Sequence, residues 1–328
     1  MNAFEYAGPT SPELAVKAIG RQGAAFLSGG TDLLNRMKDY VATPSRIVYI
    51  NDIKPLAGVH ASGGSMSIGA ATKLAAIVHD QTIAAHLPAL HRATAEVGTP
   101  QLRHMATLGG NLLQRPRCWY YRNGFGILGM KDGKSLVRTG DNRYHAIFLT
   151  DGDALFVNPS SVAAPLIALG AEATLLGPKG ERTIAVEKLY QVPRSAADSE
   201  LTIAADELLT KVTIPRIRGK NATYEIRQKR AYDWPIVLAS AALELDGSKV
   251  TSAKIMLAGV APIPWRSEEA EGAIVGKELT IDSAEAAGAA AVSKAKPLSM
   301  NAYKVTLAKV AVKRALLTIA GKKYWEEA

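Results

Sequence analysis

The chain contains a single cysteine, Cys118, which excludes an intrachain disulfide and any zinc or iron–sulfur site built from several thiolates. Its six histidines show no His-x-x-x-His pairing, so we expect no metal held by this chain alone. A Gly-x-Ser-x-Gly nucleophile motif is also missing, and the sequence offers no plausible Cys–His pair. No catalytic side chain is therefore predicted.

Long apolar runs and basic clusters are equally scarce. No stretch reaches the length needed to span a bilayer, and the N-terminus has neither the basic nor the apolar region of a secretory signal. Aromatic residues make up 6% of the chain, and the bases behind its net charge of +9 are scattered. We expect neither a membrane nor a nucleic-acid partner. An anionic cofactor or a docked protein accounts for the charge more simply.

Two Gly-Gly segments are the most informative part of what is present. Phe26–Leu34 is expected to form a short strand, a Ser-Gly-Gly turn and a helix that opens at Thr31-Asp32. Residues 106–112, Ala-Thr-Leu-Gly-Gly-Asn-Leu, have the same character. Paired glycines let a ligand approach the backbone, and the free N–H groups of a helix start suit an anion. One such turn is usually only a tight turn, but two would clamp a diphosphate from both sides.

The length of 328 residues favours two or three domains. Alternating strands and helices fill the first 55 residues, and a second unit follows with a long irregular excursion at 115–152. Within this second unit we expect one helix over 83–97, kinked at Pro88, and a strand over 154–157. Residues 216–221 form the best linker, after which strands and then helices predict an α+β module. Residues 124–129 match the dinucleotide fingerprint G-x-G-x-x-G, but no predicted strand precedes them, so we reject that match.

Several motifs together resemble one family over nearly the whole chain. They are Leu27-Ser-Gly-Gly-Thr-Asp-Leu33, Ile68-Gly-Ala-Ala-Thr72, Gln101-Leu-Arg-His-Met-Ala-Thr-Leu-Gly-Gly-Asn111, Ile214-Pro215 and Gly259-Val-Ala-Pro262. In this order and spacing they resemble the FAD-binding medium subunit of molybdenum hydroxylases, the xanthine dehydrogenase, carbon monoxide dehydrogenase and aldehyde oxidoreductase family. The run from Asn111 to Cys118 and the insertion after it are most similar to the FAD subunit of periplasmic-type aldehyde oxidoreductases.

The resemblance implies an α+β fold: a two-lobed FAD-binding domain of the vanillyl-alcohol-oxidase (PCMH) type, followed by a C-terminal domain like that of the CO dehydrogenase flavoprotein. The implied domains are 1–217, with lobes at about 1–55 and 56–217 and the insertion at 115–152, and 218–328. The implied cofactor is FAD. Its expected binding residues are Phe26, Leu27, Ser28, Gly29, Gly30, Thr31, Asp32, Leu33, Ala106, Thr107, Gly110, Asn111, Leu113, Gln114 and Ser161. For Asp32 the alternative is an ordinary acid in the first turn of a helix, and for Asn111 a turn-forming residue.

The chain also departs from the family pattern. Ser160-Ser161 stands where Ser-Asp is common, and Ile226 stands where a lysine often precedes the arginine matched by Arg230. In the similar subunits the insertion carries four cysteines for a 4Fe–4S cluster. Those positions are Cys118, Ile127, Ser135 and Ala154 here, so we predict that the loop persists without the cluster.

The leading hypothesis is an electron-transfer flavoprotein subunit, part of a molybdopterin-dependent oxidoreductase that oxidises an aldehyde or an N-heterocycle. Its implied partners are a molybdopterin-binding large subunit and a small subunit with 2Fe–2S clusters, in a heterotrimer or its dimer. A free-standing FAD oxidase of the same fold is the alternative, and a scaffold that has lost its cofactor is a third. We expect a cytoplasmic location, with export to the periplasm on a partner's signal as the alternative.

Overall fold

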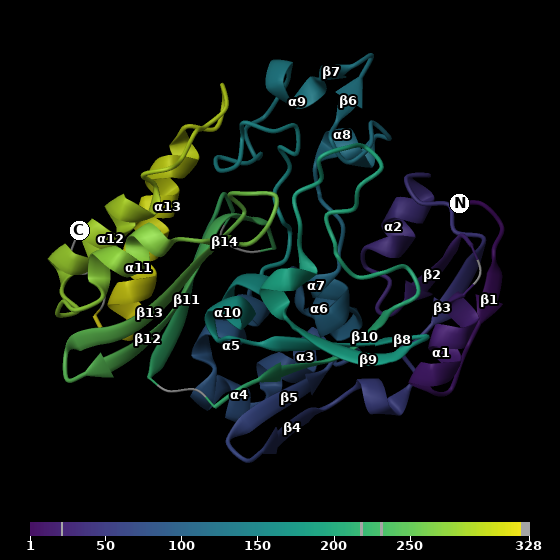
Figure 1. Cartoon of the computed structure of the whole chain (residues 1–328), viewed down its shortest axis with the longest axis horizontal. Coiled ribbons are helices and arrows are strands. Elements are labelled where there is room, and N and C mark those ends of the chain that lie inside the picture. The colour runs from purple at the N-terminus through teal and green to yellow at the C-terminus, as the bar shows by residue number, and fades with distance from the viewer. Residues whose placement is uncertain (21, 217–218, 230–231, 323–328) are drawn as a thin grey trace.

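The structure is a computed structural model that describes residues 1–20, 22–216, 219–229 and 232–322. In this part of the chain, three sheets and one short hairpin are surrounded by helices (Figure 1). The N-terminal lobe lies at one end of the molecule and the C-terminal sheet at the other. The second lobe lies between them, and the insertion lies above this second lobe. Among the described helices, none combines the length and apolarity needed to cross a bilayer.

The first lobe is a three-stranded parallel sheet of order β1-β3-β2 with two helices. Its elements are β1 (Glu5–Ala7), α1 (Pro12–Ile19), β2 (Ala24–Leu27), α2 (Leu33–Lys38) and β3 (Arg46–Tyr49). Helix α1 begins at Pro12, because the Ser11 side chain accepts a hydrogen bond from Leu14 N at 3.2 Å and proline fits the first turn. Its apolar face packs against β3 and the neighbouring sheet, so α1 joins the two lobes.

The second lobe is built on a five-stranded antiparallel sheet of order β4-β5-β10-β8-β9. Its elements are η1 (Lys54–Leu56), β4 (Val59–Ser62), β5 (Ser65–Gly69), α3 (Leu74–His79), α4 (Gln81–His86), α5 (Pro88–Ala95), α6 (Pro100–Met105), α7 (Leu108–Leu112), α10 (Ala163–Ala168), β8 (Glu172–Gly177), β9 (Gly180–Ala185), η2 (Val186–Leu189) and β10 (Leu208–Ile214). Residues 177–180 form the turn of the antiparallel hairpin β8–β9.

Two predicted elements of this lobe are wrong. The helix expected over 83–97 is split into α4 and α5, because Pro88 has no N–H to donate and instead starts the second helix. The strand expected over 154–157 is absent from that described segment. Its backbone pairs in two directions: Leu155 O accepts from Ala146 N, and Asn158 N donates to Ala261 O, both at 2.9 Å. Such scattered bonds tie the segment to two neighbours without making a ladder.

The insertion and the C-terminal part complete the fold. The insertion holds α8 (Trp119–Arg122), β6 (Met130–Lys131), β7 (Lys134–Ser135) and α9 (Leu136–Thr139), and is otherwise irregular, as predicted. The C-terminal elements are β11 (Lys220–Arg227), β12 (Pro235–Asp246), β13 (Lys249–Ala258), β14 (Trp265–Arg266), α11 (Glu268–Ile274), α12 (Ile281–Ala291) and α13 (Tyr303–Ile319). These strands form one antiparallel sheet with the three helices on one face, which confirms the α+β prediction. The predicted domain boundary at residues 217–218 lies outside the described residues.

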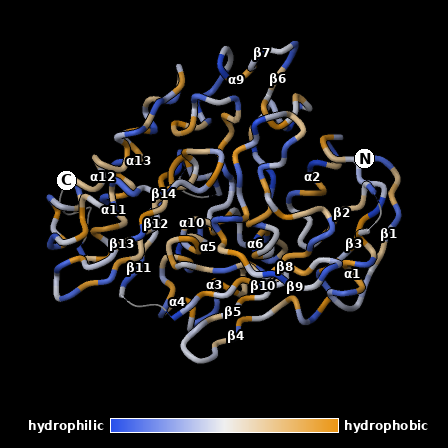
Figure 2. The backbone as a smooth tube through the Cα atoms, viewed as in Figure 1, coloured by the Kyte–Doolittle hydropathy of each residue, from blue (hydrophilic) through white to orange (hydrophobic). Residues whose placement is uncertain are grey.

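The second lobe and the C-terminal sheet share a core. Residues of α5, α10 and β10 form one apolar cluster with Leu238 of β12 and with Met256 and Ala258 of β13. In Figure 2 apolar stretches gather around α5 and α10, where the two units meet. This shared core fixes the C-terminal strands against the lobe that carries the second Gly-Gly segment.

Candidate functional site

The first Gly-Gly segment folds as predicted. Strand β2 ends at Leu27, a turn follows, and α2 begins at Leu33. Gly30 in this turn has φ +74°, a left-handed conformation that a residue with a Cβ adopts only with strain. Within the described residues, the backbone N–H groups of Gly29, Gly30 and Thr31 donate to no protein acceptor. The turn therefore offers unpaired donors to an anion.

The second Gly-Gly segment was predicted as a loop, and that prediction is wrong. Gly109 and Gly110 lie inside the short helix α7. Thr107 caps this helix, since its Oγ1 accepts a hydrogen bond from Gly110 N at 3.2 Å. Gly109 N bonds Ala70 O at 2.8 Å, which holds the helix against the end of β5. The Thr107 cap and the Gly109 N–Ala70 O hydrogen bond stabilise a helix here despite the two glycines.

The two segments nevertheless meet, as the sequence predicts. Ser28 Oγ and Thr107 Oγ1 lie 3.0 Å apart and hydrogen-bond across 79 positions of the chain. The backbones approach so closely that a Cβ at Gly29 would lie 1.9 Å from Met105 O. Lys73 Nζ supports this contact by donating to Met105 O at 3.1 Å. Only glycine fits at position 29.

Two connected cavities follow from this approach. The cradle cavity, of about 150 Å³, lies between the two segments and is also lined by Arg36, Ile50, Ala70, Gly109 and the stretch 207–209. The middle cavity, of about 280 Å³, adjoins it at Thr31, Gly110 and Gln114. Its far wall comes from the C-terminal part, at Tyr232 to Pro235. Together the linings of the two cavities extend from the first lobe to residues 232–235 of the C-terminal part.

Every residue predicted to bind the cofactor lines one of these two cavities. The cradle cavity takes Phe26, Leu27, Ser28, Gly29, Gly30, Thr31, Asp32, Leu33, Thr107, Gly110, Leu113 and Gln114. The middle cavity adds Ala106, Asn111 and Ser161. The fold thus brings the predicted segments together around two adjoining cavities.

Asp32 is engaged by protein groups. Its carboxylate accepts from Arg122 at 2.7 Å, from Arg36 at 3.0 Å and from Arg115 N at 3.2 Å, and Arg117 lies 3.3 Å away. Burial alone would raise the pKa of Asp32, but the guanidinium groups of Arg117, Arg36 and Arg122 hold it below its usual range. One carboxylate faces three guanidiniums, so the wall carries an excess of positive charge. Asp32 ties the insertion to the first glycine turn.

Asn111 is also held from behind. Its Oδ1 accepts from Ser160 Oγ at 2.8 Å, and Gln114 Nε2 donates to Asn111 O at 3.1 Å and to Pro159 O at 3.3 Å. These bonds fix the wall of the middle cavity next to Ser161, which is buried. The polar side chains of α7 and of the turn before α10 therefore act as one rigid unit.

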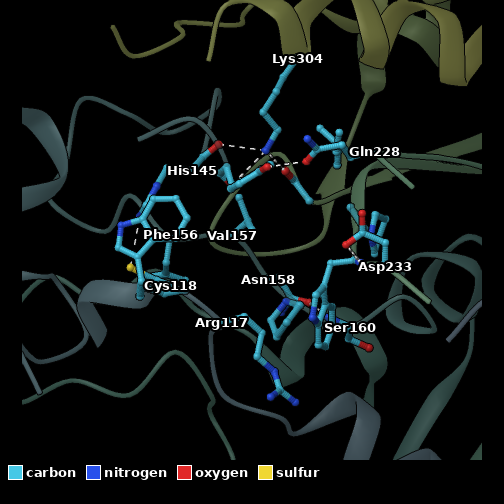
Figure 3. A pocket seen from close by; sticks show the side chains of 18 of the residues that line it. Arg117, Cys118, His145, Phe156, Val157, Asn158, Ser160, Gln228, Asp233 and Lys304 are labelled. Atoms are coloured by element: carbon cyan, nitrogen blue, oxygen red, sulfur yellow. Dashed lines mark hydrogen bonds between the residues drawn. The ribbon is translucent and has the colours of Figure 1, made fainter. Parts of the chain in front are cut away.

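A third cavity, the insertion cavity of about 420 Å³, adjoins the middle cavity at Arg117, Asp233, Trp234 and Pro235 (Figure 3). It corrects one expectation, because it contains a Cys–His pair: Cys118 Sγ lies 3.2 Å from His145 Nε2. Burial raises the pKa of the Cys118 thiol and lowers the pKa of His145 to about 4. Both groups are thus neutral near pH 7, and the thiol is not an activated nucleophile.

The sequence missed the residues that come from the C-terminal part and the insertion. Trp234 lines both the middle and the insertion cavities, and the Arg117 guanidinium lies over its ring at 4.8 Å from the centroid. Burial lowers the pKa of Arg117 to about 10. No local signal marks Trp234, because its role depends on contact with Arg117, which lies 117 positions earlier in the chain. Arg230, the partner expected for Ile226, lies outside the described residues.

The positions matched to the iron–sulfur ligands have a different role here. Cys118, Ile127 and Ala154 belong to one apolar cluster with Tyr121 and Phe156. Ser135 instead caps α9, with its Oγ 3.4 Å from Arg138 N. Within the described residues, no group of three or more His, Cys, Asp or Glu side chains is placed to hold a metal ion. Side-chain packing organises this part of the insertion.

Comparison with known proteins decides the family. Residues 2–217 match the family described as the FAD binding domain in molybdopterin dehydrogenase. This chain belongs to that family. Residues 222–319 match the CO dehydrogenase flavoprotein C-terminal domain. FAD is therefore the cofactor, and the fold is the one that the resemblance implied.

Several relatives match over nearly their whole length. The chain is similar to the aldehyde oxidoreductase FAD-binding subunit PaoB of Escherichia coli, with 29% identity over 94% of this chain and 96% of that protein. It is 29% identical to the carbon monoxide dehydrogenase medium chain of Afipia carboxidovorans, over 96% of each chain. A solved carbon monoxide dehydrogenase from Hydrogenophaga pseudoflava, which lacks the Mo-pyranopterin moiety, contains a chain with a TM-score of 0.76, 26% identity and 98% coverage of both chains.

The residues of the two connected cavities fit this cofactor. Three unpaired N–H groups of the glycine turn suit the diphosphate, and the close backbone contact at Gly29 leaves no room for a side chain there. The surplus of guanidinium groups over Asp32 adds positive charge to the same wall. Because the two linings extend from the first lobe to the C-terminal part, they suit a long dinucleotide better than a compact ligand.

Proposed function

We propose that this chain is the FAD-carrying electron-transfer subunit of a molybdenum hydroxylase complex. The carrying observation is the cradle: two glycine segments, 79 positions apart at Ser28 and Thr107, meet at one cavity, where the turn of the first segment presents the unpaired N–H groups of Gly29, Gly30 and Thr31. The family match over two-thirds of the chain gives the cradle its cofactor. When bound, FAD supplies the two-electron redox chemistry, and the chain seats, orients and tunes it.

We assign distinct roles to the residues around the two cavities. The N–H groups of Gly29, Gly30 and Thr31 bind the diphosphate, and the segment from Ala106 to Gln114 forms the opposite wall. Asn111 and Ser161 contact the part of the cofactor in the middle cavity. Asp32 acts through the arginines that it gathers, so it is a positioning residue. Phe26, Leu27, Ser28, Leu33, Thr107, Gly110 and Leu113 complete the lining.

The proposed partners are a molybdopterin-binding large subunit and a small subunit with 2Fe–2S clusters. The large subunit would oxidise an aldehyde or hydroxylate an N-heterocycle, and the small subunit would deliver the electrons to this chain. Relatives named as a FAD-binding subunit or a medium chain favour this assignment over a free-standing oxidase. We propose domains at 1–217 and 218–328, and a cytoplasmic location with export alongside a partner as the alternative.

Purification of the chain with its partners tests the proposal. We expect about one FAD per chain by absorbance and a complex in gel filtration that contains molybdenum and 2Fe–2S clusters. Single-turnover reduction by an aldehyde should reach the flavin only when all three subunits are present. A colourless chain would refute the cofactor assignment, and a lone yellow monomer that oxidises an organic substrate would favour the oxidase.

A further inference from the structure

The insertion cavity is not explained by the cofactor-binding residues. None of the fifteen residues assigned to FAD lines it, yet it shares a wall with the middle cavity through Arg117 and Trp234. Its volume of about 420 Å³ lies in the range of small-molecule sites. A ligand there would be separated from the cofactor by a single layer of side chains.

The lining of this cavity is aromatic and apolar over most of its extent. Trp119, Tyr144, Phe156 and Trp234 contribute rings, and Ile236 and Ala258 contribute aliphatic surface. The rings of Trp119 and Tyr144 are packed edge to face with centroids 5.8 Å apart, which holds both in place. Such walls suit a flat, largely apolar molecule.

One buried charge distinguishes the cavity from a plain apolar pocket. Lys304 of α13 is 1% exposed and reaches the cavity between backbone carbonyls, donating to His145 O at 3.0 Å and Tyr144 O at 3.2 Å, and also to Gly259 O. Figure 3 shows Lys304 and Arg117 on opposite sides of the cavity. No described carboxylate forms an ion pair with Lys304, and burial lowers its pKa to about 7. Negative charge that develops beside this ammonium would be stabilised.

The entrance is accessible from solvent. Tyr144, Gln228 and Lys229 are exposed residues of the lining, and Tyr144 Oη donates to Gln228 Oε1 at 2.6 Å where the insertion meets β11. A nicotinamide dinucleotide is disfavoured by the largely apolar walls, because its charged diphosphate would lose hydration against them. A planar carbonyl compound carries no such charge.

We infer that the insertion cavity is the binding site of the final electron acceptor, and that this acceptor is of the quinone class. The inference rests on the proposed function, since the electrons come from the reduced cofactor. The overall balance is FADH₂ + quinone → FAD + hydroquinone, so two electrons and two protons move and no other reactant is needed. The three N–H groups of Lys304 are occupied by carbonyls, so its contribution is charge beside a quinone oxygen and not proton donation.

Binding of 2-methyl-1,4-naphthoquinone to the flavin-loaded chain, measured by equilibrium dialysis, tests the inference. Val157 lines this cavity and neither of the other two, so Val157→Phe should fill it and weaken binding by at least about tenfold. The matched control is Val275→Phe, an exposed valine on the C-terminal domain, which should bind as the wild type does. Flavin content should be unchanged in both variants.

The charge of Lys304 predicts a second result. At about pH 6, where Lys304 is protonated, the anionic 2-hydroxy-1,4-naphthoquinone should bind about tenfold more tightly than the neutral 2-methyl compound. Equal loss of binding in both valine variants, or binding of NAD⁺ in place of the quinone, would overturn the inference. Equal affinity for the two quinones would overturn the role of Lys304. A yellow chain that binds no quinone leaves the FAD function standing, whereas a colourless chain refutes that function itself.

Discussion

Replacing Gly29 with alanine tests the cradle most directly. The added Cβ would lie 1.9 Å from Met105 O, 2.7 Å from the Met105 carbonyl carbon and 3.0 Å from Ala106 Cα. All three atoms belong to the backbone, so no side-chain rotation relieves the clash. To bring the closest contact to 3.0 Å, the two segments must separate by about 1.1 Å, the difference between 3.0 and 1.9 Å.

Overpacking of this kind costs about 1–3 kcal/mol. If this cost falls on the FAD-bound state, the affinity for FAD should decrease by about 5- to 150-fold, because 1.4 kcal/mol corresponds to a factor of ten. The Ser28–Thr107 hydrogen bond, 3.0 Å long here, should break at the same time. Flavin content after gel filtration and the dissociation constant from a titration of the apoprotein with FAD measure the effect.

Gly152→Ala is the matched control, because a Cβ there would meet nothing within 4 Å and the backbone is not in the left-handed region. This variant should retain the wild-type flavin content. If Gly29→Ala bound FAD as tightly as Gly152→Ala while remaining folded, the two glycine segments would not form the cofactor cradle, and the assignment of the cavity would be wrong.

Two further predictions concern buried groups away from the cradle. Burial raises the pKa of Glu225 to about 8 from its ordinary 4.5, so between these values the native state holds a proton that the unfolded chain has released, and stability falls as pH rises. In urea unfolding, Glu225→Gln should therefore be more stable than wild type by about 4 kcal/mol at pH 8 and by much less at pH 5. The 3.5 units between 4.5 and about 8 correspond to about 5 kcal/mol at 1.36 kcal/mol each, of which about 4 is reached at pH 8. The exposed Glu268→Gln is the control, and a difference independent of pH would contradict the assignment. Iron analysis of the isolated chain should find far less than one atom per molecule, because one thiol cannot hold a cluster; about four irons per chain would show that the insertion binds one after all.

Local patterns in the sequence account for much of the fold. Ser11-Pro12 starts α1, Asp246-Gly247 joins β12 to β13, and strand β10 ends at Ile214, directly before Pro215. Each of these signals acts over a few residues, through a cap, a turn conformation or an alternation of apolar side chains. The split at Pro88 follows the same local logic, but the sequence alone does not decide between a kinked helix and two helices.

The candidate site likewise combines features that the sequence shows with contacts that only the folded chain creates. The sequence by itself marked the two Gly-Gly segments, because residues without a Cβ allow the close backbone approach that is found at Gly29. Only the tertiary structure decided that Asp32 faces three arginines, that Cys118 lies beside His145, and that Trp234 closes the middle cavity. Apart from the pair Asp32–Arg36, which is four positions apart, these contacts join residues separated by 27 positions (Cys118–His145) to 117 positions (Arg117–Trp234). Their geometry depends on how the sheets pack, which no short stretch of sequence encodes.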